Sequence, residues 1–226
     1  MKLVIIVPAY NEAQVIFKVL KDLPIKIPGI FKLEKIVIND GSTDDTQIEV
    51  KRAKVKILNH IFNRGLGAAI KTGLDYAKQV NADIAVTFDS DGQHNPKDIN
   101  KIVKPIILNQ ADVVIGSRFK RRQKVPIDRF IINWFANLTT FILFGISSTD
   151  TQSGLRAFSK KAINKINYKA DKMEFSSEIL LEAKKHNLKV IEIPIHAIYT
   201  DYSRFKGQKN TNAIFVFSKF LVRLLR

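Results

Sequence analysis

The 226-residue sequence contains no cysteine, one tryptophan and two methionines. Without cysteine, the chain has no disulfide framework, no thiolate-bound zinc or iron–sulfur centre and no thiol nucleophile. Glycine and proline are also few, at 10 and 7 residues, whereas 46% of the residues are hydrophobic, which excludes a collagenous, fibrous or disordered chain. We therefore expect one compact core, and any metal ion must be bound by oxygen or imidazole ligands.

Acidic residues are outnumbered in this sequence. The chain has 37 Lys and Arg residues against 21 Asp and Glu residues, a formal net charge of +16, which favours an anionic partner. The stretches 118–129 and 201–226 together hold twelve basic and two acidic residues, so the excess charge lies mostly in the second half of the chain. These basic residues form no recognisable nucleic-acid-reading motif, and we expect no nucleic-acid partner.

Long hydrophobic runs are also missing. The apolar run at residues 3–7 stops at Pro8 and is too short for an export signal. Residues 130–149 carry no charge, but their Asn, Thr and Gly residues favour an interfacial or groove-lining helix over a bilayer-spanning one. Residues 212–226 place Phe and Leu on one helical face and Lys and Arg on another. We therefore expect a main domain at 1–207 and a basic amphipathic helix at 208–226, which either lies on a membrane or packs against the domain.

Runs of β-branched residues alternate with amphipathic segments in the first half of the chain. The expected strands are 2–8, 34–39, 55–59, 83–88 and 112–116. This alternation is typical of an α/β fold with a mostly parallel central sheet and helices on both faces. Polar clusters follow four of these strands. Because open parallel sheets bind ligands beyond the carboxyl ends of their strands, we expect one site at that edge.

Two aspartates follow the fourth expected strand. Asp89 and Asp91 are two residues apart in an extended segment, so both side chains can point the same way. Two converging carboxylates repel each other unless they share a cation, and hard oxygen ligands suit Mg²⁺ or Mn²⁺. Gln93 is a candidate third oxygen ligand. Such an ion would bridge the phosphates of a nucleotide-sugar and neutralise the departing diphosphate. The alternative is a turn whose acids are solvated.

Three polar or aromatic residues follow the first two expected strands. The carboxylate of Asp40 can accept a hydrogen bond from a base or a ribose hydroxyl, and Tyr10 offers an aromatic face near it. Glu12 either binds a ribose or caps the first helix through its N-terminal dipole.

Two other patterns are weaker. The glycine pair at Gly65 and Gly67 lacks the third glycine of a dinucleotide fingerprint, because Ile70 occupies that position, and the sequence has no P-loop. The four histidines have no metal-like spacing, and only His94 lies beside the aspartate pair.

Several strings along residues 3–207 resemble those of one family, in the family's order. They are IIVPAYNE, INDGSTDDT, NRGLGAAI, DSDGQHNP, VIGSRF, DTQSGLRAF and SRFKG. The sequence resembles the inverting nucleotide-sugar glycosyltransferases of the GT-A fold, and within them the dolichyl-phosphate (polyprenyl-phosphate) sugar synthases. The resemblance implies nucleotide-sugar contacts at Pro8, Tyr10, Glu12, Asp40, Asp89, Ser90 and Asp91, and metal ligands at Asp89, Asp91 and Gln93.

The resemblance also implies a reaction. One sugar would pass from GDP-mannose or a UDP-hexose to a dolichyl or polyprenyl phosphate, with inversion and with Mg²⁺ or Mn²⁺. A lipid monophosphate is already anionic near neutral pH, so the enzyme needs cations rather than a strong general base. We expect the acceptor phosphate to meet Arg118, Arg129, Arg204 and Lys206, and we expect Asp91, Arg118 and Arg129 to be catalytic.

The sugar and the acceptor stay open at this stage. DSDGQHNP looks most like the mannose synthases, whereas DTQSGLRAF looks closer to the glucosyltransferases. Asp150, the first residue of DTQSGLRAF, resembles an acidic position near the acceptor in that family, or else it forms a turn or a cap. An alternative acceptor is a soluble or polysaccharide hydroxyl, which requires a positioned carboxylate base. A non-enzymatic nucleic-acid binder and a sugar nucleotidyltransferase are weaker alternatives.

The expected location follows from the same resemblance. The larger members of the family carry C-terminal transmembrane helices, and here the basic tail would take their place. We expect a peripheral protein at the cytoplasmic face of a membrane, without a signal peptide and with a membrane subunit as a further partner.

Overall fold

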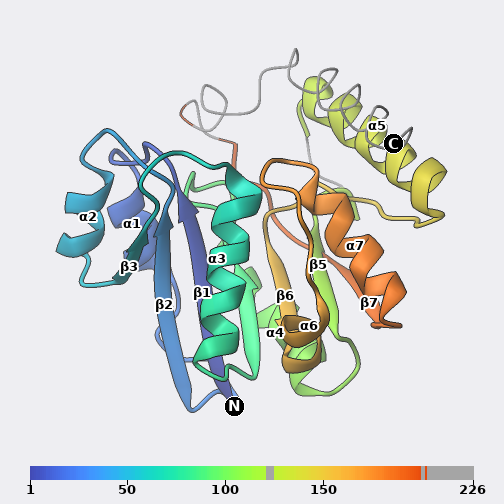
Figure 1. The fold of residues 1–226 in the computed structure, drawn as a ribbon, viewed down its shortest axis with the longest axis horizontal. Coiled ribbons are helices and arrows are strands. Elements are labelled where there is room, and N and C mark those ends of the chain that lie inside the picture. The colour runs from blue at the N-terminus through green and yellow to red at the C-terminus, as the bar shows by residue number, and fades with distance from the viewer. Residues whose placement is uncertain (121–124, 200–201, 203–226) are drawn as a thin grey trace.

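The computed structural model describes residues 1–120, 125–199 and 202. Its centre is a seven-stranded sheet with helices on both faces (Figure 1). The strands are β1 (Lys2–Ala9), β2 (Lys32–Asn39), β3 (Lys56–Asn59), β4 (Ile84–Thr87), β5 (Val113–Ser117), β6 (Arg156–Ser159) and β7 (Val190–Pro194). The helices are α1 (Ile16–Asp22), α2 (Thr46–Arg52), α3 (Leu66–Gln79), α4 (Asp98–Ile107), α5 (Ile127–Phe144), α6 (Lys160–Lys165) and α7 (Phe175–Lys185). The expected helix at 208–226 and the predicted acceptor residues Arg204 and Lys206 lie outside the described residues.

The sheet is mostly parallel, with strand order β3-β2-β1-β4-β6-β5-β7. β1 pairs in parallel with β2 and β4, β2 with β3, and β5 with β7, whereas β6 is antiparallel to both β4 and β5. All five strands predicted from the sequence are confirmed, as is the mostly parallel sheet. The sequence did not predict β6 or β7, because β6 has four residues inside a polar string and β7 is only partly buried.

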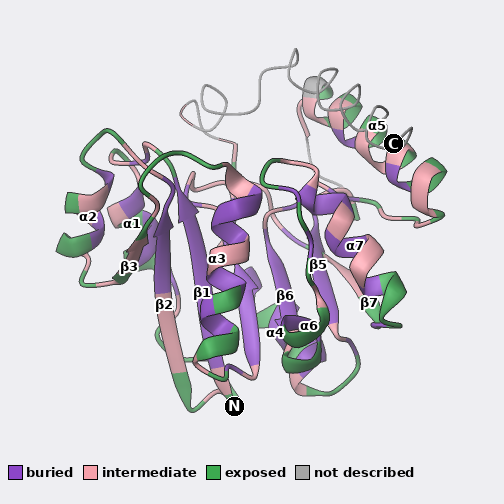
Figure 2. Cartoon of the chain, in the orientation of Figure 1, coloured by how far each residue is buried: buried purple, intermediate pink, exposed green. Residues whose placement is uncertain are grey.

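The core consists of two apolar layers, one on each face of the sheet (Figure 2). β1 contributes Leu3, Ile5 and Val7 to the layer beneath α1, α2 and α4. It contributes Val4 and Ile6 to the layer beneath α3, α6 and α7. A strand covered on both faces must be apolar at every position, which explains its unbroken hydrophobic sequence.

Helix α3 approaches β1 closely at Gly73. A Cβ atom at this glycine would lie 2.2 Å from Ile6 Cγ2. The missing side chain therefore brings α3 against the sheet and fixes its N-terminus beside the carboxyl ends of β1 and β2.

Helix α5 confirms the helix expected within residues 130–149. It ends at Gly145, whose left-handed backbone (φ 61°) suits a glycine at this position. Asn133 and Asn137 donate to the carbonyl of Thr149 at 2.8 and 2.9 Å and hold the following loop. One face of α5 exposes large apolar side chains: Ile127, Phe130, Ile131, Trp134, Phe135, Leu138, Phe141 and Ile142. None of the described helices is long and apolar enough to cross a bilayer.

Candidate active site

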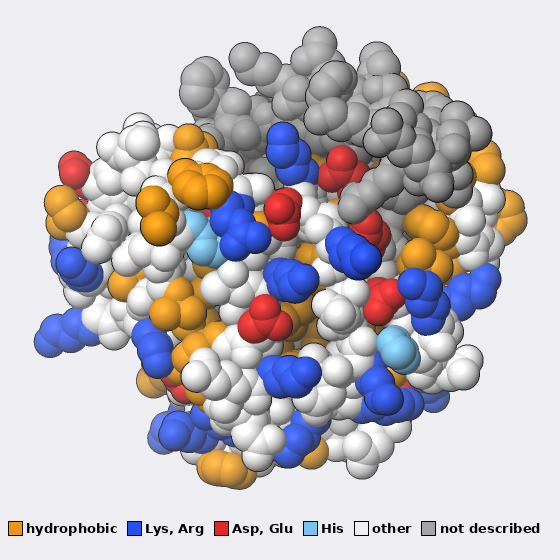
Figure 3. All heavy atoms as spheres, in the orientation of Figure 1, with side chains coloured by type: hydrophobic (Ala, Val, Ile, Leu, Met, Phe, Trp, Pro, Cys, Tyr) orange, Lys and Arg blue, Asp and Glu red, His pale blue; other side chains and the backbone are white. Residues whose placement is uncertain are grey.

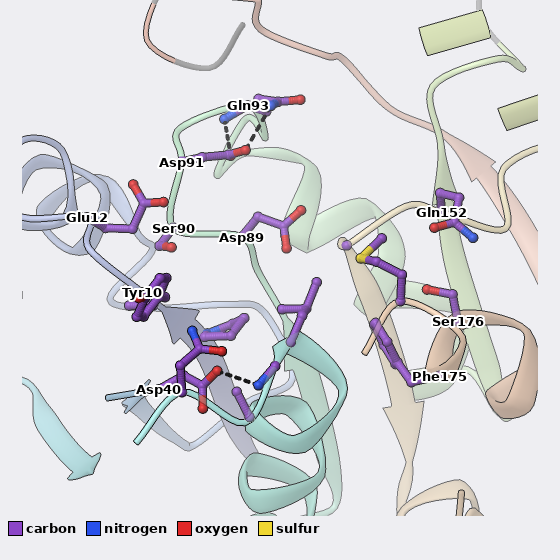
Figure 4. Close-up of a pocket in the computed structure, with 18 of the residues that line it drawn as sticks. Tyr10, Glu12, Asp40, Asp89, Ser90, Asp91, Gln93, Gln152, Phe175 and Ser176 are labelled. Atoms are coloured by element: carbon purple, nitrogen blue, oxygen red, sulfur yellow. Dashed lines mark hydrogen bonds between the residues drawn. The ribbon is translucent and has the colours of Figure 1, made fainter. Parts of the chain in front are cut away.

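A cleft of about 450 Å³ opens at the carboxyl edge of the parallel strands. The loops after β1, β2, β4 and β5 contribute to it, together with the starts of α3, α5 and α7. The sequence-predicted residues that line this cleft are Pro8, Tyr10, Glu12, Asp40, Asp89, Ser90, Asp91, Gln93, Arg118 and Arg129. Figure 4 shows Tyr10, Glu12 and Asp40 on one side, the segment 89–93 in the middle and Phe175 and Ser176 on the other side. The polar clusters that we expected to meet at this edge of the sheet therefore do line one cleft. The roles of the individual residues stay predictions.

The carboxylate of Asp89 is fixed from two sides. His94 Nε2 lies 3.0 Å from Asp89 Oδ2 and donates to it. On the other side, a Cβ atom at Gly154 would lie 2.0 Å from Oδ2 and 2.2 Å from Oδ1, so only glycine leaves room for this carboxylate. Burial raises the pKa of Asp89, but the hydrogen bond and charge of His94, with two buried arginines nearby, outweigh burial and hold the pKa below its ordinary value of 3.8.

The carboxylate of Asp91 has the opposite pKa shift. Burial and the negative charge of Asp89 raise its pKa from 3.8 to about 6. The backbone N–H of Gln93 donates to Asp91 Oδ1 at 3.0 Å, and Gln93 Nε2 donates to Oδ2 at 2.8 Å. In this arrangement the amide nitrogen of Gln93 faces Asp91. A role for Gln93 as an oxygen ligand stays a prediction, and it requires the amide to turn.

The donor set suits a divalent cation that is shared with a ligand. Among the described residues, no group of three or more His, Cys, Asp or Glu side chains is arranged to hold a metal ion alone. Asp89 and Asp91 nevertheless line the same cleft, and the charge of Asp89 contributes, after burial, to the raised pKa of Asp91. Mg²⁺ is typically bound by one or two carboxylates plus substrate phosphates, so two carboxylates are a fitting protein contribution.

Asp40 holds a loop as well as lining the cleft. Its Oδ1 accepts from the backbone N–H of Arg64 at 3.0 Å, and its Oδ2 accepts from that of Gly65 at 2.7 Å. His60 Nδ1 lies 2.6 Å from Oδ1, and its Nε2 lies 2.9 Å from the hydroxyl of Thr72. Asp40 is 3% exposed. The predicted contact of Asp40 with a nucleoside stays a prediction, and the structure adds that Asp40 shapes the wall formed by residues 60–65.

Glu12 and Tyr10 form the rim beside Asp40. Glu12 is buried, and its Oε2 accepts from the phenol of Tyr202 at 2.7 Å. The backbone carbonyl of Glu12 accepts from the N–H of Ile16 at 2.9 Å, so Glu12 lies at the start of the first helical turn. Ribose binding and a role at the helix N-terminus both stay predictions for its carboxylate. The side chain of Tyr10 is 43% exposed over the cleft, which leaves a ring face accessible to a ligand.

Arg118 is paired with Asp150. Its Nε and one terminal nitrogen each donate to the Asp150 carboxylate at 2.7 Å, and its backbone N–H donates at 3.0 Å. Burial alone would lower the pKa of Arg118, but the charge and hydrogen bonds of Asp150 raise it above its ordinary value. Asp150 therefore holds Arg118 at the cleft wall as a permanent cation and offsets part of its charge. Arg129 lines the same wall from the first turn of α5.

A second buried arginine lies behind this wall. Arg156, on β6, donates to the carbonyls of Thr151 at 2.6 Å, Ser153 at 2.9 Å and Ser176 at 3.4 Å. Burial lowers its pKa to about 10, so Arg156 stays protonated at neutral pH. It ties the loop 150–154 to the start of α7, and both segments line the cleft.

Sequence reasoning missed several cleft residues. They are Asn63, Gly65, Leu66, Ala69, Ile132, Asn133, Gln152, Gly154, Met173, Phe175 and Ser176. Gly154 and Arg156 lie in the string DTQSGLRAF, which the resemblance singled out without assigning these two residues. Residues 173–176 carry no motif, and their place follows only from the packing of α7.

Comparison with known proteins defines the class. The model of the family described as glycosyl transferase family 2 matches residues 4–166, most of the described domain. The chain therefore belongs to glycosyl transferase family 2.

Individual relatives extend this result. The chain is 43% identical to an uncharacterised protein of Methanocaldococcus jannaschii, over 98% of this chain and 90% of that protein. It is 39% identical to the UDP-N-acetylglucosamine–dolichyl-phosphate N-acetylglucosaminyltransferase of Methanococcus voltae, over 98% of this chain and 94% of that protein.

A solved structure supports the fold. The glucosyl-3-phosphoglycerate synthase of Mycobacterium tuberculosis, in complex with Mn²⁺ and UDP-glucose, matches with a TM-score of 0.67 and 20% identity, over 88% of this chain and 71% of that one. The likeness confirms the expected GT-A-like α/β fold.

The close contact at Gly154 yields a first prediction. In Gly154→Ala the new methyl group would occupy the position of the Asp89 carboxylate, so Asp89 must move while the core is untouched. We expect the affinity for Mn²⁺, measured by isothermal titration calorimetry with a nucleoside diphosphate present, to fall by about 10–100-fold. Ser153→Ala, in the same loop, should retain wild-type affinity. Unchanged affinity in Gly154→Ala would show that Asp89 does not bind the ion.

The raised pKa of Asp91 yields a second prediction. Its carboxyl is protonated in the folded chain up to about pH 6 but in the unfolded chain only up to about 3.8. This group therefore stabilises the metal-free fold fully below pH 3.8, and that contribution is lost as the pH rises through 6. In EDTA, Asp91→Asn should raise the free energy of unfolding at pH 7 by about 1–3 kcal/mol, and by less near pH 4.

Urea unfolding at both pH values provides the measurement. Asp75→Asn, at an exposed position of α3, serves as the control and should change the stability little at either pH. If the gain from Asp91→Asn is the same at both pH values, or is absent, Asp91 is not held in a repulsive environment.

Proposed function

We propose that this glycosyltransferase moves one sugar from a nucleotide-sugar to a polyprenyl or dolichyl phosphate, with inversion and with a divalent cation. The observation that carries the proposal is that one cleft brings four acids together with two arginines. We assign Glu12, Asp40, Asp89 and Asp91 to the donor and its cation, as the acidic side, and we assign Arg118 and Arg129 to the acceptor, as the basic side. The relative from M. voltae, whose name includes dolichyl phosphate as acceptor, supports this choice of acceptor class.

The donor fits the acidic side. The ring of Tyr10 is accessible to a nucleotide base. The carboxylates of Glu12 and Asp40 line the same cleft and would accept hydrogen bonds from the base or from ribose hydroxyls. Asp89 and Asp91 would hold Mg²⁺ or Mn²⁺ together with oxygens of the donor diphosphate, with Gln93 as a further oxygen ligand after its amide turns. The bound ion would stabilise the negative charge that develops on the departing diphosphate.

The acceptor fits the basic side. A lipid monophosphate is already a nucleophile near neutral pH, so the protein must attract and orient it rather than deprotonate it. Arg118, fixed by Asp150, and Arg129 can pair with the phosphate oxygens, and buried Arg156 adds positive potential behind them. Ile132, Met173 and Phe175 supply an apolar lining next to the exposed face of α5, which suits a polyprenyl chain. Arg204 and Lys206 remain predicted contacts.

A hydroxyl acceptor is the second candidate, and the cleft disfavours it. Such an acceptor needs a carboxylate base on its own side of the sugar. Among the described residues, the acids that line the cleft are Glu12, Asp40, Asp89 and Asp91, all of which are assigned here to the donor and its cation. The nearby Asp150 is engaged by Arg118, and Glu178 accepts from the backbone N–H groups of Lys169 and Ala170. A phosphate acceptor requires no such base.

The place of the reaction follows from the acceptor. We propose that the protein acts peripherally at the cytoplasmic face of a membrane, and a membrane subunit remains a predicted partner. Asp91, Arg118 and Arg129 are the residues that we propose touch the reacting groups.

The reaction is testable with radiolabelled donor, Mn²⁺ and a polyprenyl phosphate in detergent. We expect label to appear in the lipid fraction with wild-type protein and to fall by at least about a hundredfold in Asp91→Ala. Asp75→Ala, on the exposed face of α3, is the matched control and should retain activity. Full activity in the presence of excess EDTA would overturn the metal-dependent mechanism, and transfer to sugars but not to lipid phosphate would establish the hydroxyl acceptor.

The donor is testable by thermal unfolding. A ligand that binds only the folded chain raises the unfolding temperature by mass action. With Mn²⁺ present, we expect UDP-N-acetylglucosamine or another UDP-sugar to raise it more than GDP-mannose, because the relative from M. voltae is named for a UDP-sugar. A larger shift with GDP-mannose would assign the mannose branch instead.

A further inference from the structure

The loop between β3 and α3 presents two consecutive large apolar side chains to solvent. Ile61 is 99% exposed and Phe62 is 66% exposed. Single exposed apolar residues are common, but neighbouring ones at the edge of a ligand cleft are typical of a contact surface. The following residues, Asn63 and Gly65, line the cleft itself.

Hydrogen bonds and close backbone packing hold this loop in one conformation, and that conformation exposes Ile61 and Phe62. The N–H of His60 donates to the carbonyl of Asn39 at 2.9 Å, and the His60 ring bonds Asp40. At the other end of the loop, Asp40 accepts from Arg64 and Gly65. In the middle, the loop backbone packs on Gly41, where a Cβ atom would lie 2.5 Å from the carbonyl carbon of Phe62. Ile61 and Phe62 cannot turn inward without breaking these contacts.

Two exposed basic residues, Arg64 and Lys172, lie beside the loop. Arg64 is half exposed, and its Nη2 lies 3.9 Å from Oδ1 of the exposed Asp171. Figure 3 shows hydrophobic side chains beside Lys, Arg, Asp and Glu side chains on this face of the molecule. An apolar tip with cations beside it is complementary to the headgroup region of an anionic bilayer. Helix α5, which exposes large apolar side chains, lies at the same end of the sheet as this loop (Figure 1).

We propose that Ile61 and Phe62 insert into the surface of an anionic membrane, while Arg64 and Lys172 contact lipid headgroups. The inference rests on the proposed function, because a lipid phosphate can enter the cleft only if the carboxyl edge faces the bilayer. Since the loop is already held in one conformation, membrane contact would cost little ordering entropy. The partner is the bilayer itself, and a second copy of the chain is the competing occupant.

Vesicle binding tests the loop, with a matched control in the same chain. The paired substitution Ile61→Ser with Phe62→Ser removes the apolar tip. Ile25→Ser with Phe31→Ser removes an equally exposed Ile and Phe, 79% and 82% exposed, from the connection before β2 at the opposite edge of the sheet. On vesicles of equimolar phosphatidylcholine and phosphatidylglycerol, we expect the loop variant to bind at least about tenfold more weakly, or about 1.4 kcal/mol. The control should bind like wild type. Equal binding by the loop variant and wild type, or equal losses in both variants, would refute the proposal.

Site-specific labelling gives a second measurement that does not depend on loss of binding. The chain has no cysteine, so Phe62→Cys and Phe31→Cys each create one attachment point for an environment-sensitive fluorophore. We expect a blue shift on adding vesicles for the label at 62 and none for the label at 31. A shift at 62 that follows protein concentration without vesicles would assign the loop to a second copy of the chain and overturn the membrane contact.

The outcome is separable from that of the proposed function. Donor-induced thermal stabilisation and sugar transfer to a polyprenyl phosphate in detergent are measured on the same variants. If wild type transfers no sugar to lipid phosphate in detergent, the proposed function fails whatever the vesicles show. If transfer occurs but the loop substitutions leave vesicle binding unchanged, only the loop inference fails.

Discussion

The repulsion between Asp89 and Asp91 is the interaction on which the rest of the site depends. Two ionised carboxylates in one cleft repel each other, and here their pKa values shift in opposite directions. His94 and the nearby buried arginines keep Asp89 ionised, whereas burial and the charge of Asp89 raise the pKa of Asp91 to about 6. The pair of carboxylates therefore suits a cation, which would remove their mutual repulsion. The strands beneath the pair are buried on both faces and hold these loops in place.

The antiparallel strand β6 joins the two sides of the cleft. It lies between β4, which precedes the aspartates, and β5, which precedes Arg118. The segment before β6 places Gly154 against Asp89, and Arg156 on β6 donates to carbonyls of the loop 150–154 and of the first turn of α7. One short strand thus sets both the position of the Asp89 carboxylate and the positive potential behind Arg118.

Asp40 and His60 connect the cleft with the outer surface. The same carboxylate that lines the cleft holds the loop whose tip exposes Ile61 and Phe62. Because these hydrogen bonds fix the loop, the orientation of its tip is coupled to the geometry of the cleft wall beside Asp40. The proposed contact of the tip with a bilayer would orient the cleft toward lipid without any movement of the residues that line it.

The sequence by itself determined the strands, the edge that bears the site and the acids at that edge. These features are local, because a buried parallel strand needs a continuous apolar run and the residues after it must form the ligand edge. Five strands, the helix within 130–149 and the gathering of Pro8, Tyr10, Asp89 and Arg118 in one cleft were predicted in this way. Only the tertiary structure decided that Arg118 is bound by Asp150, that Asp40 clamps residues 60–65, and that Gly154 meets Asp89. Those contacts join residues 20 to 65 positions apart in sequence, and their partners depend on strand order and loop packing, which no local pattern encodes.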